Sequence, residues 1–261
     1  MSALNTAAGF GVGLIVGVTG VGGGALMTPI LVLLFGVAPA AAVGTDLWFA
    51  ALTKLVGGAV HHRKGSVDWQ VFRRLCLGSL PASALMLWLL DATASTPMRQ
   101  GVILKSLGGV LLLTAAAMIF KRQTHALGQS LRSTAPEAFK RAQPALTVVA
   151  GAVLGLLVTL TSVGAGALGA VMLLYLYPFR MTPSRLVGTD IVHAIPLTVV
   201  AGTGHLAMGH VDLHLLGELL LGSVPGIVLG SLIGHRTPEH LLRLTIATVM
   251  ALVGGKLLLA G

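Results

Sequence analysis

The apolar residues of this 261-residue chain fall into long runs, separated by short segments that hold most of the Lys and Arg. Six runs have about 20 residues, the length at which an α-helix crosses the hydrocarbon core of a bilayer. These predicted spans are 39–61, 69–90, 99–120, 183–205, 213–234 and 239–260. Two further runs, 4–37 and 145–178, are too long for one straight crossing, and both contain glycine clusters. The pattern predicts a polytopic membrane protein.

Composition supports this class. The chain is 55% hydrophobic and only 10% charged, whereas soluble domains carry roughly 25% charged residues. Aromatic residues make up 5%, and no segment alternates as the strands of an outer-membrane barrel do. We therefore expect an all-α protein. The net charge of +9 comes from Lys and Arg near the ends of the apolar runs, a distribution that the positive-inside bias explains without a nucleic-acid partner.

The chain contains two related halves. Gly44-Thr45-Asp46 recurs 144 residues later as Gly188-Thr189-Asp190, and Gly65-Ser66-Val67-Asp68 recurs at the same spacing as Gly209-His210-Val211-Asp212. Repeated matches at one spacing indicate a duplicated unit. We predict a first repeat over 1–122, a basic cytoplasmic linker over 123–143 and a second repeat over 144–261.

Each long run is either one tilted crossing or a re-entrant pair of half-helices. Re-entrant runs give each half an odd number of crossings, so the two halves are inverted in the membrane. In that topology the loop cations that remain outside are Arg99, Lys105 and Lys256. Single crossings would move Lys256 inside and would place outside Arg180, Arg185, Arg236 and Arg243. The positive-inside rule favours the inverted topology, in which each repeat is a Gly-broken re-entrant helix pair followed by three transmembrane helices.

The glycine clusters predict breaks in the two long runs. The first reads Thr19-Gly20-Val21-Gly22-Gly23-Gly24, and its counterpart reads Thr161-Ser162-Val163-Gly164-Ala165-Gly166. Each Gly costs a helix interior roughly 1 kcal/mol relative to Ala. Irregular backbone at membrane depth is tolerated where it lines a cavity or is buried in protein, and the helix that follows presents free N–H groups to an anion. The alternative is that these glycines only allow close helix packing.

Four ionisable residues lie inside predicted spans: Asp46, Lys54, Asp190 and His193. Ionisable side chains at membrane depth are functional candidates by default. The two Asp residues are placed symmetrically, and His193 shares a helix face with Asp190 because it follows three residues later. Lys54 lies about two turns beyond Asp46. The alternative is structural, with each Asp bonded to backbone at a break and Lys54 only a buried partner of Asp46.

Other polar clusters have simpler explanations. Asp68 and Asp212 each follow Gly-x-Val just before an apolar run, which predicts N-capping. His210 and His214 are spaced as two zinc ligands can be, but the first half has no equivalent cluster, so we predict no metal and no cofactor. The sequence contains no P-loop, HExxH or GxSxG motif, and no nucleophile–base arrangement is visible, so we do not expect an enzyme.

At the glycine clusters the sequence resembles a known family. Gly20-Val21-Gly22-Gly23-Gly24, the following Pro29, Gly44-Thr45 and the later Gly-x-Val-Asp are similar to the TauE/SafE family of sulfite-exporter-like membrane proteins. The resemblance covers nearly the whole chain. It implies a multi-pass protein of the cytoplasmic (inner) membrane that exports sulfite, sulfoacetate or related organosulfur anions. The family often has Ser or Asn after Gly-Thr, where this chain has Asp46 and Asp190, two acids that would repel an anion if both were ionised.

We therefore predict a secondary transporter that exports a small sulfur-containing oxyanion, with its site where the breaks of the two halves meet. The predicted partners are the small anion and the lipid bilayer, with homo-oligomerisation left open. The predicted substrate-binding residues are Thr19, Gly20, Gly22, Gly23, Gly24, Thr45, Asp46, Lys54, Thr161, Ser162, Gly164, Gly166, Thr189, Asp190 and His193. The alternatives are a proton- or cation-coupled carrier that uses Asp46 and Asp190, and a non-transporting membrane scaffold or assembly partner.

Overall fold

The structure, a computed structural model, describes residues 3–19, 24–92, 96–234 and 239–260. The first half forms α1 (Ala3–Thr19), α2 (Gly24–Leu33), α3 (Pro39–Arg63), α4 (Trp69–Ala92) and α5 (Thr96–Ile119). The second forms α7 (Pro136–Thr161), α8 (Ala167–Leu176), α9 (Pro183–Ala207), α10 (Leu213–Gly234) and α11 (Glu239–Ala260), after α6 (Lys121–Thr134). The described residues form no strand, and five helices are long and apolar enough to cross a membrane. The predicted all-α polytopic class is confirmed.

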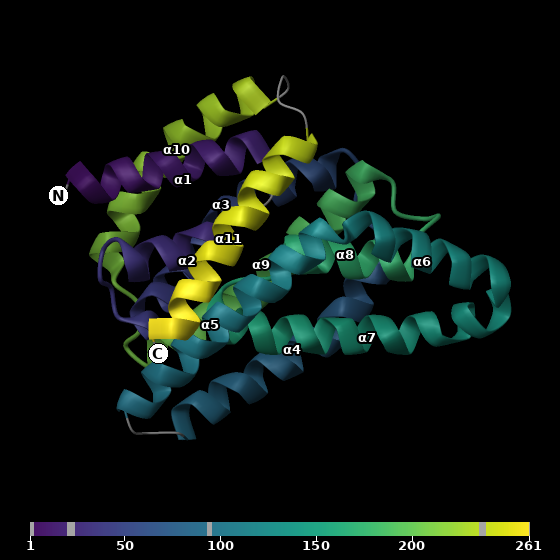
Figure 1. Cartoon of the computed structure of the whole chain (residues 1–261), viewed down its shortest axis with the longest axis horizontal. Coiled ribbons are helices and arrows are strands. Elements are labelled where there is room, and N and C mark those ends of the chain that lie inside the picture. The colour runs from purple at the N-terminus through teal and green to yellow at the C-terminus, as the bar shows by residue number, and fades with distance from the viewer. Residues whose placement is uncertain (1–2, 20–23, 93–95, 235–238, 261) are drawn as a thin grey trace.

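The segment between the halves is more ordered than a simple linker. It forms the amphipathic helix α6 and also the first two turns of α7, which begins at Pro136. Proline is favoured in the first turn of a helix because its missing N–H has no helical partner there. Gly128 of α6 packs directly on the backbone of Tyr175 in α8, so α6 lies against the second half rather than apart from it (Figure 1).

The main helix pairs each join one half to the other. Helix α1 runs along α10, α4 along α7, α5 along α11, and α3 along α9 (Figure 1). Two of these pairs rely on glycines spaced by four. In α7, Gly151 and Gly155 lie directly on the backbone of α4. In α1, Gly9 and Gly13 lie in the same way on the backbone of α10. Small residues at this spacing let helix backbones approach closely in a membrane, so the halves are interlocked.

The second long apolar run turns back on itself. Helix α7 ends at Thr161, and α8 then returns along it, because the end of α8 is hydrogen-bonded to the early turns of α7. Gln143 Nε2 donates to the carbonyl of Leu176, and the Thr147 and Tyr177 hydroxyls are 2.7 Å apart. The chain therefore reverses direction at the break, as a re-entrant pair would, while its re-entry into the bilayer stays a prediction. The inverted orientation of the two halves in the bilayer stays a prediction.

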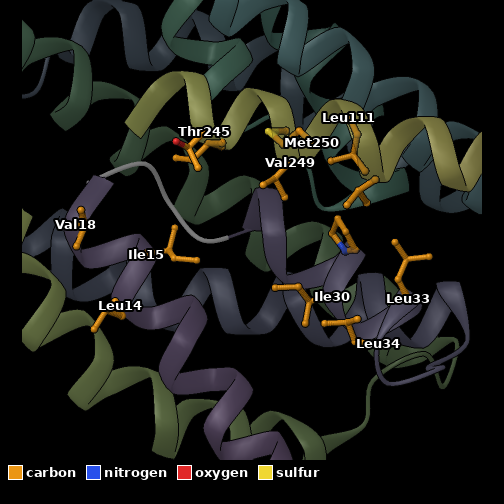
Figure 2. Close-up of a pocket in the computed structure, with 13 residues that line it drawn as sticks. Leu14, Ile15, Val18, Ile30, Leu33, Leu34, Leu111, Thr245, Val249 and Met250 are labelled. Carbon is orange, nitrogen blue, oxygen red and sulfur yellow. The ribbon is translucent and has the colours of Figure 1, made fainter. Parts of the chain in front are cut away.

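The first long run has a comparable reversal. In Figure 2, α1 ascends from Leu14 to Val18, whereas the chain descends from Ile30 in α2 to Leu34, the residue after its end. Both helices line one apolar cavity of about 480 Å³, which α5 and α11 complete. Helix α2 has 10 residues, as does α8. At 1.5 Å per residue each is about half the length needed to cross a bilayer, so both are half-helices.

Candidate functional site

The second glycine cluster is an irregular segment between α7 and α8, as predicted. Ser162, the C-cap of α7, has φ 59°, and Gly164 and Gly166 have φ 117° and 137°. These are backbone conformations that side chains with a Cβ rarely adopt. The Thr161 hydroxyl donates to the Leu157 carbonyl at 2.7 Å and accepts the Val163 amide at 3.2 Å. Thr161 therefore stabilises the break itself.

The first cluster is described only at its ends. Thr19 is the last residue of α1 and Gly24 is the first residue of α2. The other three candidates of this cluster, Gly20, Gly22 and Gly23, lie outside the described residues. Their predicted contact with substrate stays a prediction.

Lys54 connects the first half to the break of the second half. Its side chain is 7% exposed, and its ammonium donates to the Ala165 carbonyl at 3.2 Å. Asp46 and Asp190 lie close enough to Lys54 to interact with its charge. A buried ammonium at irregular backbone, near two buried carboxylates, is a cluster that membrane proteins retain at functional sites. The structure thus brings together the central ionisable candidates of the two halves.

The Asp46 carboxylate has only one of its two oxygens satisfied. Thr28 of α2 donates to Asp46 Oδ2 at 2.6 Å. Asp46 Oδ1 is buried without a hydrogen-bond partner, and so is the hydroxyl of Ser162, which lies next to the same carboxylate. Buried polar atoms without partners are rare and mark a strained or ligand-binding place. Sequence reasoning missed Thr28, although it is a hydroxyl residue in the half-helix that follows the first break.

Asp190 and His193 occupy neighbouring positions on α9. The Asp190 carboxylate packs directly against Gly169 in the first turn of α8, where any larger residue would clash with it. His193 is 1% exposed, and its Nε2 lies 2.9 Å from the hydroxyl of Ser79 on α4. The charge of Lys54 also acts on His193. The α9 face that sequence spacing predicted therefore points toward the same interior region as Lys54.

Thr45 and Thr189 each bond a loop of the other half, and their predicted contact with substrate stays a prediction. Thr189 Oγ1 accepts the backbone amide of Asp68 at 2.9 Å, and Thr45 Oγ1 accepts the amide of Asp212 at 3.1 Å. Each hydroxyl therefore anchors the helix-entry loop of the other half. The predicted N-caps are confirmed, because Asp68 Oδ1 accepts the amide of Val71 and Asp212 Oδ1 accepts that of Leu215.

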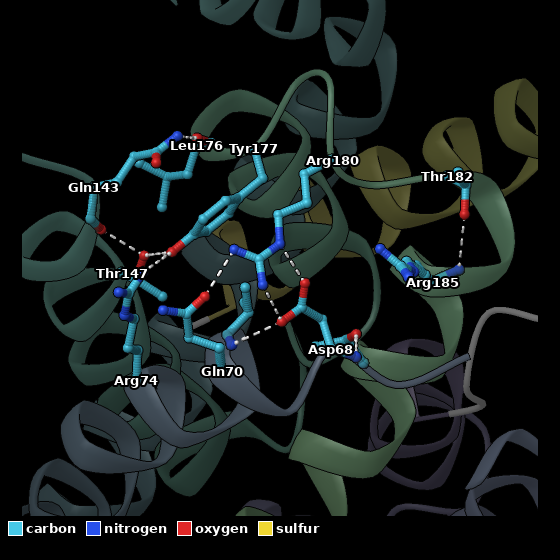
Figure 3. A network of polar contacts seen from close by, with 12 residues as sticks. Asp68, Gln70, Arg74, Gln143, Thr147, Leu176, Tyr177, Arg180, Thr182 and Arg185 are labelled. Atoms are coloured by element: carbon cyan, nitrogen blue, oxygen red, sulfur yellow. Dashed lines mark hydrogen bonds and ion pairs between the residues drawn. The ribbon is translucent and has the colours of Figure 1, made fainter. Parts of the chain in front are cut away.

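A polar network surrounds Asp68 at the start of α4 (Figure 3). Arg180 forms a two-point ion pair with Asp68, with Nε–Oδ2 at 2.6 Å and Nη2–Oδ1 at 2.8 Å. Its remaining nitrogen donates to Gln70. Arg74 donates to the Tyr177 hydroxyl at 3.1 Å. This network ties the loop after α8 to the start of α4, a connection that sequence reasoning did not detect.

The described residues contain no group of three or more His, Cys, Asp or Glu side chains arranged to hold a metal ion. The polar groups that converge at the α7–α8 break are instead one ammonium, two carboxylates and several hydroxyls. These groups can bind a small anion or a small cation, depending on which of the charged side chains are neutralised by one another.

Comparison with known proteins agrees with this architecture. The family model described as Sulfite exporter TauE/SafE matches residues 5–257. The chain is 40% identical over 255 residues to the probable membrane transporter protein YjnA of Bacillus subtilis (strain 168), covering 96% of this chain and 97% of the relative. The probable membrane transporter protein YdhB of the same organism is 26% identical, with 94% and 95% covered. No solved structure matches. The chain therefore belongs to the TauE/SafE family and is a multi-pass membrane transporter.

Proposed function

We propose that this transporter exports a small sulfur-containing oxyanion, such as sulfite or an organosulfonate like sulfoacetate, across the cytoplasmic membrane. The family description supports the substrate class. The structural observation that carries the proposal is the placement of Lys54. Its buried ammonium donates to the carbonyl of Ala165, which lies in the α7–α8 break. Of the two predicted breaks, this is the one whose backbone the structure describes.

The break supplies the other donors. Helix α8 begins at Ala167, directly after the positive-φ residue Gly166. The first amides of a helix have no helical acceptor, and the N-terminal end of the helix dipole favours negative charge. A sulfur oxyanion at this end would accept the first amides of α8 while Lys54 balances its charge. Ser162, at the end of α7, and His193, on α9, would contribute further polar contacts.

Outward movement needs no separate energy source in this scheme. An interior-negative membrane potential favours the exit of an anion by about 2.3 kcal/mol per charge per 100 mV. A potential of this size corresponds to roughly a fiftyfold concentration ratio for a monovalent anion. The potential alone therefore supports export of a toxic or excess anion.

A second candidate is a carrier coupled to protons or to another cation through Asp46 and Asp190. The supporting observation is the charge balance of the buried cluster, in which two carboxyl groups lie within electrostatic range of the single ammonium of Lys54. If both acids are ionised, the cluster has an excess negative charge that would oppose anion binding. The test is the pH dependence of anion transport by the double variant Asp46→Asn, Asp190→Asn. Loss of that dependence would favour this candidate.

The experiment that tests the export proposal is efflux from liposomes loaded with sulfite or sulfoacetate and reconstituted with purified protein. Lys54→Met should abolish efflux, because the variant keeps the length of the side chain and removes its charge. Lys105→Met is the matched control, since Lys105 is an exposed residue on α5, and it should transport normally. Normal efflux by Lys54→Met would remove Lys54 from the site. A wild-type protein that moves none of a panel of sulfur oxyanions would instead favour a non-transporting membrane partner.

A further inference from the structure

Two buried oxygen atoms of the central cluster belong to neighbouring side chains, the Asp46 carboxylate and the Ser162 hydroxyl. Asp46 is fully buried, Ser162 is 5% exposed, and neither Asp46 Oδ1 nor Ser162 Oγ has a hydrogen-bond partner among the described residues. Thr28 Oγ1 completes the group, because it donates to the other oxygen of Asp46 at 2.6 Å and keeps lone pairs free. Leaving such atoms unsatisfied in a dry interior costs free energy, so this arrangement is expected to accept a ligand.

The two hydroxyls near Asp46 have no sequence counterparts near Asp190. Aligning the two glycine clusters makes Ser162 the counterpart of Gly20 and Ala170 the counterpart of Thr28. The hydroxyls that surround Asp46 therefore have no equivalent for Asp190, which instead packs against Gly169. If the hydroxyls served only to hold a buried carboxyl group, both Asp46 and Asp190 would be expected to have them. Their presence near Asp46 alone indicates one ligand-binding site, at Asp46.

The electrostatics of the cluster favour a cation at this place. When both are ionised, Asp46 and Asp190 together carry one more negative charge than Lys54 can balance. Ser162 is also the C-cap of α7, where the helix dipole is negative. Interrupted transporter helices commonly use their C-terminal ends and unwound backbone to bind a cation, and their N-terminal ends to bind an anion. Here the C-terminal end of α7 adjoins Asp46, and the N-terminal end of α8 adjoins Lys54.

We propose that Asp46, Ser162 and Thr28 bind one monovalent metal cation of the sodium class, and that this cation promotes binding of the anion at Lys54. The second part rests on the proposed anion function, whereas the first does not. The cation cancels the excess negative charge of the cluster, so the anion meets a cluster with no net charge. By thermodynamic linkage the anion then raises the affinity for the cation by the same factor.

The ligand set explains the choice of a monovalent ion. Hard cations take oxygen ligands, but Ca²⁺ sites use six to eight of them and several carboxylates. The cluster offers one carboxylate and two hydroxyls. The nearby ammonium of Lys54 repels a divalent cation more strongly than a monovalent one. A singly charged ion that completes its shell with backbone oxygen or water fits this set.

The test is thermal unfolding of the purified full-length protein in sodium chloride and in choline chloride at equal ionic strength. The unfolding midpoint should be higher in sodium, with a saturable concentration dependence, because a ligand that binds only the folded state stabilises it. Ser162→Gly and Asp46→Asn should lose this sodium-specific increase, whereas Lys105→Met, a change at an exposed residue of α5, should keep it. Gly is compatible with the φ of 59° at Ser162, so this variant removes the hydroxyl without straining the backbone.

Three results would overturn the proposal. One is an equal midpoint in sodium and choline for the wild-type protein. Another is a sodium effect that survives Ser162→Gly and Asp46→Asn. The third is stabilisation that follows pH and not sodium, which would place a proton at Asp46. Efflux that is equally fast without sodium would refute the link to the anion while leaving the export function intact. Conversely, sodium-specific stabilisation in a protein that moves no anion would support the cation site and refute the export proposal.

Discussion

The contact between α1 and α10 makes a quantitative prediction from two glycines of one helix. Gly13 lies on the backbone of α10, where an added Cβ would come 2.7 Å from the Cα of Ser223. Gly11, two residues earlier, has nothing within 4 Å of its Cβ position. We therefore compare Gly13→Ala with Gly11→Ala. The two changes are chemically identical and differ in what the new methyl group meets.

The magnitude follows from the geometry. Both variants gain about 1 kcal/mol of helix propensity, so this effect cancels in the comparison. Ordinary contact begins near 3.4 Å, and the atoms that block Gly13→Ala belong to backbone that cannot rotate away. The two helices must separate by several tenths of an ångström, and overpacking of this kind costs about 1–3 kcal/mol. Gly11→Ala should therefore be the more stable variant by about that amount.

The assay is thermal or denaturant unfolding of the two purified variants beside the wild-type protein in the same detergent. For a chain of this size a difference of 1 kcal/mol corresponds to roughly 2–4 °C in the midpoint. We expect Gly11→Ala to unfold at or above the wild-type temperature and Gly13→Ala below it. Equal midpoints for the two variants would refute the close backbone approach of α1 and α10, and with it the interlocking of the halves on this side.

Further predictions concern the loops that join the halves. Arg180→Gln should destabilise the protein by about 1–2 kcal/mol, because the Asp68 side chain is only 4% exposed while that of Arg180 is 41% exposed, so solvent screens part of the ion pair. Arg185→Gln, which changes an exposed residue, should leave the unfolding midpoint within error, and an equal loss in both variants would contradict the ion pair. Thr189→Val should cost about 1–3 kcal/mol by leaving the buried Asp68 amide without an acceptor. Hydrogen exchange should be faster at that amide, and unchanged exchange would exclude the contact.

Features that depend on local chain preferences were predictable from sequence. The α7–α8 break follows from glycines that occupy positive φ at Gly164 and Gly166. The caps at Asp68 and Asp212 follow from a side chain that bonds an amide three residues later. In each case the controlling interaction lies within one turn of the residue, so nothing distant is needed to infer it.

The candidate site was only partly predictable. Sequence reasoning selected Asp46, Lys54 and Asp190, because charge at membrane depth is costly wherever it occurs. It could not identify Thr28 as the partner of Asp46, since hydroxyl residues are common in apolar helices and carry no comparable cost. It also could not show that the Thr45 and Thr189 hydroxyls bond loops of the opposite half. Their predicted contact with substrate stays a prediction.

The sequence by itself determined the membrane class, the helical fold, the duplication and the position of the described break. Hydropathy and glycine content fix these because lipid accepts only apolar helices with satisfied backbone. The tertiary structure alone decided which groups meet: Thr45 bonds a residue 167 positions away, and Lys54 reaches a carbonyl 111 positions away. The interior of the protein and the surrounding lipid are equally apolar, so hydropathy does not say which helices pair. That choice depends on backbones that fit closely at small residues, and it is this fit between the halves that places Lys54 at the break.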